Sequence, residues 1–158
     1  MSAQNNTTHQ ISMIAIQIAA LSGFSPIITT ASLRNKDFVT SLGATHVLDR
    51  SLDAAALTAS IKSIIGGTTL RYVFDGVGTP ETQKFSYRLI ADADGGSLLS
   101  VQADAVTDED KAKGKKVEIL NPFPNNHPEF IKELFENLPK YLESGAFKVN
   151  HHLLCDYA

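Results

Sequence analysis

The chain has 158 residues, of which 43% are hydrophobic and 20% are charged, as in an ordinary soluble globular protein with one domain. A formal net charge of -3 argues against a basic surface for nucleic acid or membranes, and the single cysteine, Cys155, rules out an internal disulfide and gives no structural zinc pattern. We therefore expect a cytoplasmic protein that needs no nucleic acid, membrane or metal ion.

The amino-terminal region has two parts of different character. Residues 1–10 are polar, rich in Asn and Thr, and predict a disordered lead-in. The apolar run that follows is too short to span a membrane, and no Lys or Arg precedes it as in a signal peptide. Residues 11–22 predict a helix that ends at Gly23, and its expected buried face consists of Ile11, Ile14, Ile18 and Leu21.

The segment 26–50 predicts a strand, a helix and a second strand. Residues 27–30 are a short β-branched run behind a proline, and residues 46–49 predict a second short strand. Between them, Ser32 is a good N-cap for a helix that Gly43 would end. Two strands joined by a helix over about twenty residues form a βαβ unit, which builds parallel sheets.

The alternation of helix and strand continues to residue 101. We expect Ser51 to cap a third helix and Gly66 to end it. A strand at 72–75 follows, then a helix opened by Thr79 and Pro80, and then a strand at 97–101. This order predicts the α/β class with a doubly wound parallel sheet.

The last third of the chain is less regular. Residues 102–116 are charged and predict a solvated loop, and residues 117–120 predict a further strand. Pro128 opens a helix that Pro139 should kink or divide. His151 and His152 have no partner at metal-ligand spacing, so we expect no metal site there.

Several motifs, taken in order, carry a resemblance to a known family. They are AIQIA at 15–19, SLGATHVLDR at 41–50, YVFDGVG at 72–78, GGSLLSV at 95–101 and KKVEILNPF at 115–123. The chain resembles the cofactor-binding domain of medium-chain dehydrogenase/reductases, in the zinc-independent branch of enoyl-reductase-like and quinone-reductase-like enzymes common in fungi. The resemblance implies an incomplete Rossmann-like domain over 11–150 and a C-terminal tail at 151–158.

The end of the first predicted strand predicts which dinucleotide is preferred. The stretch after it, TASLRNK, is polar and basic, and no acidic residue comes before Asp37. Such a strand end favours the 2′-phosphate of NADP, whereas an acid there favours NAD. The resemblance implies that Ser32 and Asn35 hold the adenosine 2′-phosphate, with Arg34 and Lys36 as nearby charges.

The resemblance assigns three further cofactor-binding residues. Arg50 would pack by the adenine, Gly76 would follow a strand end that faces the cofactor, and Val101 would close the nicotinamide end. Local structure offers alternative roles for this region, since the glycines at 76 and 78 could simply make a turn, and Asp75 could cap the following helix.

The chain departs from the family pattern at its beginning. A dinucleotide-binding domain opens with a strand and a Gly-rich turn that holds the pyrophosphate, but no glycine occurs from Asn5 to Ser12. Ten polar residues also cannot supply a buried central strand. We therefore expect a Rossmann-like sheet that lacks its first central strand and Gly-rich loop, with a slot between the strands at 26–30 and 71–75.

These departures leave three hypotheses for function. The first is an NADP-binding-type fragment of an alcohol-dehydrogenase-like or enoyl-reductase-like oxidoreductase, with weak or lost NADP binding, no catalytic residues and no activity alone. The second is a non-enzymatic interaction module whose open sheet pairs with itself or with a full-length reductase. The third is an incomplete chain of an active NADPH-dependent reductase.

Overall fold

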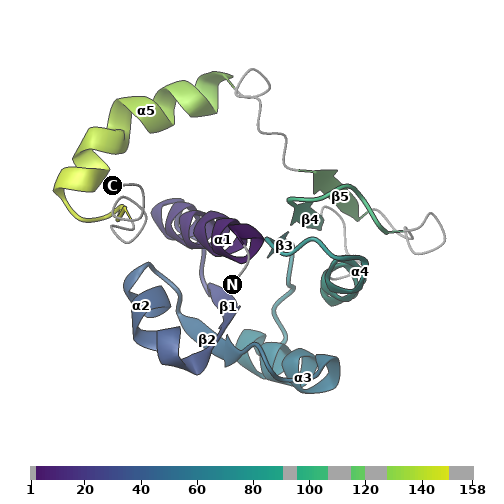
Figure 1. Ribbon diagram of the computed structural model, residues 1–158. Coiled ribbons are helices and arrows are strands. Elements are labelled where there is room, and N and C mark those ends of the chain that lie inside the picture. The colour runs from purple at the N-terminus through teal and green to yellow at the C-terminus, as the bar shows by residue number, and fades with distance from the viewer. Residues whose placement is uncertain (1–2, 91–95, 107–114, 120–127, 150–158) are drawn as a thin grey trace.

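The computed structural model describes residues 3–90, 96–106, 115–119 and 128–149. Its strands lie in one row but form two parallel sheets (Figure 1). One sheet pairs β1 with β2, and the other has the order β3-β4-β5. The strands are β1 (Ile28–Ala31), β2 (His46–Asp49), β3 (Tyr72–Asp75), β4 (Ser97–Ser100) and β5 (Lys116–Ile119).

This arrangement confirms the predicted α/β class and the predicted slot. A doubly wound sheet of order 3-2-1-4-5-6 that lacks its first strand leaves one group of two and one group of three strands. The observed sheets are these two groups, and the break between them lies between β1 and β3. Each strand has only four residues, so the hydrogen-bonded ladders are short.

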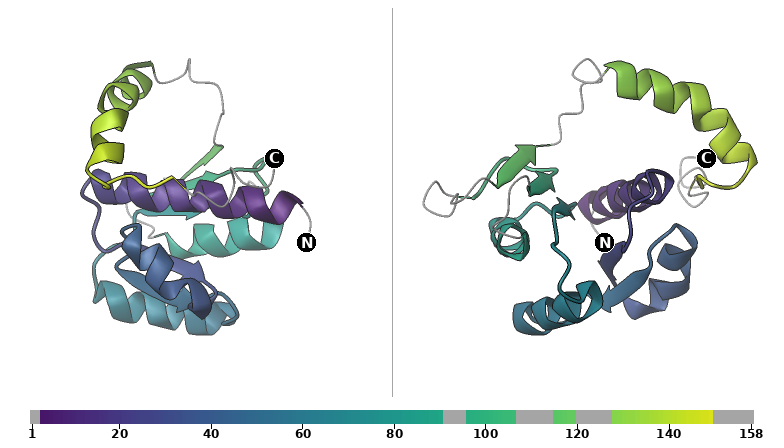
Figure 2. Two further views of the ribbon diagram at one scale, coloured as in Figure 1. Left: turned by 60° about the vertical axis from the view of Figure 1, so that its left-hand side comes forward. Right: turned by 180° about the vertical axis from the view of Figure 1, so that it is seen from behind.

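The helices cover both faces of the row of strands. Figure 1 and the rear view in Figure 2 place α1 and α2 on one face and α3 and α4 on the other. These helices are α1 (Ala3–Leu21), α2 (Lys36–Ser41), which follows the 3-10 turn η1 (Leu33–Asn35), α3 (Ala54–Ile65) and α4 (Pro80–Leu89).

Both sheets run in the same direction. Phe24, just after α1, packs edge-on against Tyr72 at the start of β3, with 5.6 Å between the ring centroids. Gly76, just after β3, lies against Ser12 within α1. β3 therefore runs from the C-terminal end of α1 toward its N-terminal half, and β1 turns back along the same helix after the short connection 22–27.

Each sheet has a hydrophobic core cluster of its own. The first, beside β1 and β2, consists of Ile16, Val39, Leu42 and Ala44. The second, beside β3 to β5, consists of Tyr87, Ile90, Leu98 and Val106. The two clusters share no residue, as expected if a central strand that would join them is missing.

Helix α1 differs from its prediction at two points. It begins at Ala3, so the lead-in that we predicted to be disordered is helical from that residue on. No proline or glycine interrupts residues 3–10, and extending an existing helix is cheap. The predicted buried face was also wrong, because Ile14 and Leu21 are 45% and 37% exposed while Ile16 and Gln17 are buried.

The helix ends of the βα units agree with the sequence in part. Thr79 caps α4 as predicted, and Gly66 ends α3 in the left-handed conformation. The cap of α3 is Asp53, whose carboxylate accepts from the N–H of Ala56 at 2.8 Å, and not Ser51. Ser51 instead donates its N–H to the Asp49 carboxylate at 2.9 Å.

The last helix, α5 (Pro128–Glu143), continues through Pro139 and is not divided. It has no buried residue, and Figure 1 shows it as a curved helix that stands apart from the other helices. No helix in the described residues is long and apolar enough to cross a membrane. The predicted tail 151–158, with Cys155, lies outside the described residues, as does most of the predicted loop 102–116.

Candidate functional site

The carboxyl ends of the parallel strands gather the predicted site residues along one edge. Ala31 at the end of β1 pairs with Asp49 at the end of β2, and Asp75 at the end of β3 pairs with Ser100 at the end of β4. Ligands of open α/β sheets bind at this edge. The site residues predicted from the sequence follow these four strand ends directly and are Ser32, Arg34, Asn35, Lys36, Arg50, Gly76 and Val101.

Ser32 and Asn35 occupy the cap positions of two consecutive helical segments. Ser32 precedes η1 and Asn35 precedes α2, and neither side chain makes a capping hydrogen bond. The turn is closed by the backbone instead, where the N–H of Asn35 donates to the Ser32 carbonyl at 2.8 Å. Both side chains are half-buried, and their polar atoms are not used by the cap. Ser32 therefore stands at the cap position of the 3-10 turn η1 without a side-chain hydrogen bond, and the cap of α2 is Asn35 and not Ser32 as predicted.

Two exposed cations stand beside these cap residues. Arg34 and Lys36 are both exposed, and Asp37 is the first acid along this segment. Together with Ser32 and Asn35 they offer hydroxyl, amide, guanidinium and ammonium groups within one turn of chain. This combination suits a phosphate monoester.

Arg50 lies next to this segment. Its N–H donates to the Ala31 carbonyl at 3.0 Å, which fixes the end of β2 beside the residue that precedes Ser32. The backbone N–H and the hydroxyl of Ser51 lower the pKa of the Asp49 carboxyl from 3.8. The Arg50 side chain is exposed, so it is available at the surface next to the cap residues.

The other half of the edge is built by β3 and β4. Val101 donates its N–H to the Asp75 carbonyl at 3.3 Å, so Val101 and Gly76 are neighbours across the two strands. Gly76 is buried, and a Cβ added to it would lie 2.4 Å from Ser12 Oγ. Gly76 therefore permits the close approach of α1 to the end of β3.

Asp75 fixes the loop that follows β3. Its buried carboxylate accepts from the N–H groups of Val77 and Gly78, both at 3.0 Å, and from the Thr82 hydroxyl at 2.7 Å. Asp75 thus joins the turn to the first turn of α4, but the cap of that helix is Thr79 and not Asp75. Gly78 has a φ of +73° and packs on Gln102 from the neighbouring loop.

Gln83 is a structural residue that sequence reasoning missed. Its side chain is 0% exposed and lies between the loops that follow β3 and β4. Its amide donates to the carbonyls of Gly78 at 3.0 Å and Ala103 at 2.9 Å and accepts from the N–H of Ala105 at 2.9 Å. The sequence signal for a buried Gln83 is that this polar residue lies on the face of the predicted helix that should pack against the sheet.

Gln17 is a second buried amide that the sequence did not single out. It is 3% exposed, and its oxygen accepts from the N–H of Lys148 at 2.6 Å. Its nitrogen lies 3.3 Å from the Lys148 carbonyl, and the Lys148 ammonium donates to the Ser41 carbonyl at 2.8 Å. The chain after α5 is thereby attached to α1 and α2.

The pyrophosphate part of a dinucleotide has no matching cradle in the described residues. A Gly-rich turn between a strand and a helix N-terminus usually supplies the backbone N–H donors. Here the helix continues from Ser12 back to Ala3, and Ser12 fills the space over Gly76. The described residues therefore offer polar and cationic groups for a phosphate monoester after β1, but no backbone cradle for a pyrophosphate.

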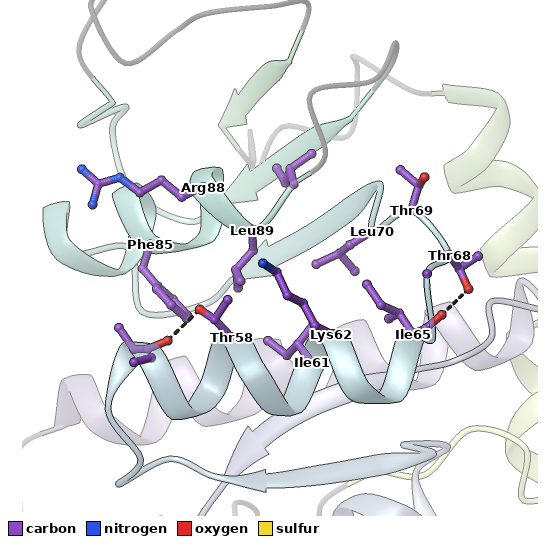
Figure 3. Close-up of a pocket in the computed structure, with 14 residues that line it drawn as sticks. Thr58, Ile61, Lys62, Ile65, Thr68, Thr69, Leu70, Phe85, Arg88 and Leu89 are labelled. Atoms are coloured by element: carbon purple, nitrogen blue, oxygen red, sulfur yellow. Dashed lines mark hydrogen bonds between the residues drawn. The ribbon is translucent and has the colours of Figure 1, made fainter.

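A separate cavity of about 800 Å³ lies between α3 and α4 (Figure 3). Apolar side chains from both helices point into it, among them Ile61, Ile65, Phe85 and Leu89. No predicted cofactor residue lines this cavity, so it is not part of the strand-end site. In the part of the chain that the structure describes, no three His, Cys, Asp or Glu side chains come together as metal ligands.

Comparison with known proteins shows which family this chain belongs to. A family model described as zinc-binding dehydrogenase matches residues 11–126. The trans-enoyl reductase himH of Aspergillus japonicus is 37% identical over 84 residues, which are 53% of this chain and 23% of that protein. The matched stretch is therefore only about a quarter of that relative's length.

Solved structures share the fold over most of the chain. The nucleotide-binding subdomain of the enoylreductase domain of PpsC from Mycobacterium tuberculosis is 21% identical, with a TM-score of 0.62 over 89% of this chain and 80% of that chain. A mycobacterial protein solved in complex with NADPH is 24% identical, with a TM-score of 0.67 over 89% of this chain and 45% of that chain.

Proposed function

Because this chain belongs to the zinc-binding dehydrogenase family of medium-chain dehydrogenase/reductases, we propose that it is part of the NADP-binding domain of an enoyl-reductase-like oxidoreductase. The observation that carries the proposal is the segment 32–36 after β1. It combines two cap side chains that make no capping hydrogen bond with two exposed cations, and it has no acid. The similarity to a trans-enoyl reductase and to an NADPH-bound structure supports the same function.

Each residue of the strand-end site has a definite task in this proposal. Ser32 and Asn35 donate hydrogen bonds to the adenosine 2′-phosphate, and Arg34 and Lys36 balance its charge. Arg50 covers the adenine from the next strand. On the other half of the edge, Val101 closes the nicotinamide end, and Gly76, which Ser12 covers, follows the strand end that faces the cofactor. NADPH, when bound, supplies a hydride for the reduction of a substrate.

The missing pyrophosphate cradle limits what this chain does alone. Hydride transfer requires a nicotinamide that is held against the substrate in a closed site. A half-site that holds only the adenosine phosphate leaves the nicotinamide unplaced. We therefore expect weak NADP binding and negligible turnover from this chain, and activity only in a longer polypeptide that adds the preceding strand, the Gly-rich turn and a substrate domain.

The experiment is a calorimetric titration with adenosine 2′,5′-bisphosphate, adenosine 5′-monophosphate and NADPH. A half-site binds the bisphosphate and NADPH with similar affinity and binds the monophosphate about tenfold more weakly. The double substitution Arg34→Ala and Lys36→Ala removes this preference. Lys132→Ala, on exposed α5, is the matched control and leaves it unchanged.

Two results would contradict the proposal. Equal affinity for the monophosphate and the bisphosphate would show that segment 32–36 does not read the 2′-phosphate. Micromolar NADPH affinity together with turnover of an enone or a quinone by this chain would show that the pyrophosphate and nicotinamide ends are also held, and the half-site would be wrong.

A second candidate function is association through the divided sheet. It is favoured by one observation, the break between β1 and β3 in the described residues. Unpaired strand edges are templates for pairing with another chain. In this function the module binds a second polypeptide, either a copy of itself or a related reductase, and sedimentation at increasing concentration would detect self-association.

A further inference from the structure

The cavity between α3 and α4 has an apolar base. Ile61 of α3 and Ile90, just after α4, line it and are buried, and Leu70 beside them is half-buried. Figure 3 shows Phe85 and Leu89 extending from α4 toward α3. None of the described strands contributes a lining residue, so the cavity lies between the helices. Ligand pockets are mostly apolar and have volumes of about 300–1,000 Å³, and this cavity of about 800 Å³ falls in that range.

The mouth of this cavity is cationic. Lys62 of α3 and Arg88 of α4 line the cavity and are exposed, whereas no Asp or Glu is among its described lining residues. Figure 3 shows Lys62 extending from α3 toward Leu89. Neither cation forms an ion pair within the described residues. The lining therefore carries two positive charges and no negative one, in a chain whose formal net charge is -3.

Two threonine hydroxyls in the lining are already used by the backbone. The Thr58 hydroxyl donates to the Ala54 carbonyl at 2.7 Å, and the Thr68 hydroxyl donates to the Ile65 carbonyl. A hydroxyl has a single hydrogen to donate, so these two offer no donor to a ligand. The ammonium and guanidinium groups at the mouth are therefore the strongest donors that a ligand in this cavity can reach.

The two cations also have a role in their own helices. Lys62 lies in the last turn of α3 and Arg88 in the last turn of α4, where the helix macrodipole favours positive charge. This role explains the cations, but it does not require an apolar cavity beneath them. A cationic mouth above an apolar base is complementary to a molecule with an anionic head and an apolar tail.

We propose that the cavity between α3 and α4 binds an organic carboxylate with an extended apolar tail, of the chemical class of a medium-chain fatty acid. The tail lies against Ile61, Phe85 and Leu89, and the carboxylate lies at the mouth and accepts hydrogen bonds from Lys62 and Arg88. The binding is noncovalent. It is a function additional to dinucleotide binding, because no residue of the strand-end site lines the cavity.

The test is a calorimetric titration of the intact chain with four probes. Decanoate has both the head and the tail, decylammonium has the same tail with the opposite charge, and butanoate and octanoate have the same head with shorter tails. We expect saturable binding of decanoate, and binding of decylammonium and butanoate that is weaker by about tenfold or more. Each CH₂ that the cavity removes from water should strengthen binding by up to about fourfold, so octanoate should lie between butanoate and decanoate.

Substitutions in the protein test the two cations. The double variant Lys62→Met and Arg88→Met keeps two long apolar side chains but removes both charges, so it should weaken decanoate binding by about tenfold. Lys132→Met together with Lys140→Met, on α5, is the matched control, because it removes the same charge from exposed positions away from the cavity lining. The control variant should bind decanoate as the unchanged chain does.

Methyl resonances of the unchanged chain locate the ligand even if a variant does not fold. Decanoate should shift the methyl signals of Ile61 and Leu89, which line the cavity, and leave those of Val47 in β2 unchanged.

Three results would overturn the proposal. Absence of decanoate binding would remove the site. Equal affinity for decylammonium would show that the two cations serve only the helix ends. Displacement of decanoate by adenosine 2′,5′-bisphosphate would place it at the strand ends instead, whereas binding of both together supports two separate sites. The titration with decanoate contains no nucleotide, so failure of the dinucleotide proposal leaves its outcome unaffected.

Discussion

Replacement of Gln83 by leucine should loosen the second sheet and leave the first one intact. Gln83 is fully buried, and its amide makes three hydrogen bonds to the backbone of the loops after β3 and β4. Leucine has nearly the same size but no donor or acceptor. The substitution therefore removes the three bonds with little change in volume.

The size of the effect follows from the three partners. The Gly78 carbonyl is buried and would lose its partner, whereas water can reach exposed Ala103 and half-buried Ala105. A buried group without a partner costs about 1–3 kcal/mol, and each exchange with water costs about 0.5–1.5 kcal/mol. We expect a loss of roughly 3 kcal/mol for the unit that contains β3 and β4.

Native-state hydrogen exchange measures the stability of each unit separately, so it can locate this loss of stability in the unit that contains β3 and β4. At about 1.4 kcal/mol per factor of ten, the amides of β4, such as Leu98, should exchange about a hundredfold faster. The amide of Val47 in β2 should keep its rate. Lys84→Leu, at the next position of α4, is the matched control. An unchanged rate at Leu98, or an equal acceleration at Val47, would refute the reasoning.

Three smaller predictions concern local geometry. Gly43→Ala should cost about 1–3 kcal/mol in thermal unfolding, because φ is +115° and the new Cβ would lie 2.6 Å from the Cβ of Ala20; normal stability would contradict this. Asp53→Ala should cost about 1 kcal/mol by loss of the α3 cap, whereas Asp53→Asn should cost less. Ser51 lowers the pKa of Asp49, so this carboxylate stabilises the fold above its unfolded pKa, and the contribution is lost as the pH falls through the lower folded pKa. Asp49→Asn should therefore make acid unfolding depend less on pH, and an identical acid titration would contradict this.

The sequence predicted the βα units well because their signals are local. The strands at 46–49 and 72–75 have the predicted bounds, and the cap at Thr79 and the stop at Gly66 are observed. Such features depend on β-branched runs, caps and glycines within a few residues. The polar character of residues 1–10, which cannot supply a buried central strand, also predicted the break in the sheet, since strand order follows from the family pattern.

The predictions that failed concern packing between parts of the chain that are far apart in the sequence. The apolar period of α1 predicted Ile14 and Leu21 inside, but the helix turns Ile16 and Gln17 inward. Gln17 is buried because a backbone segment 131 residues away satisfies its amide, and Gln83 is buried for a similar reason. Hydrophobic periodicity cannot anticipate a buried polar group whose partners come from other loops.

The division of the hydrophobic core has a consequence for cooperativity. Ile16 and Leu42 belong to one cluster, Leu98 and Ile90 belong to the other, and no ladder joins the two sheets in the described residues. We expect two such units to open separately although α1 contacts both sheets, so that a single melting temperature would average two transitions. A strand bound between β1 and β3 would merge them into one transition. Calorimetric peak width therefore reports whether the sheet is complete.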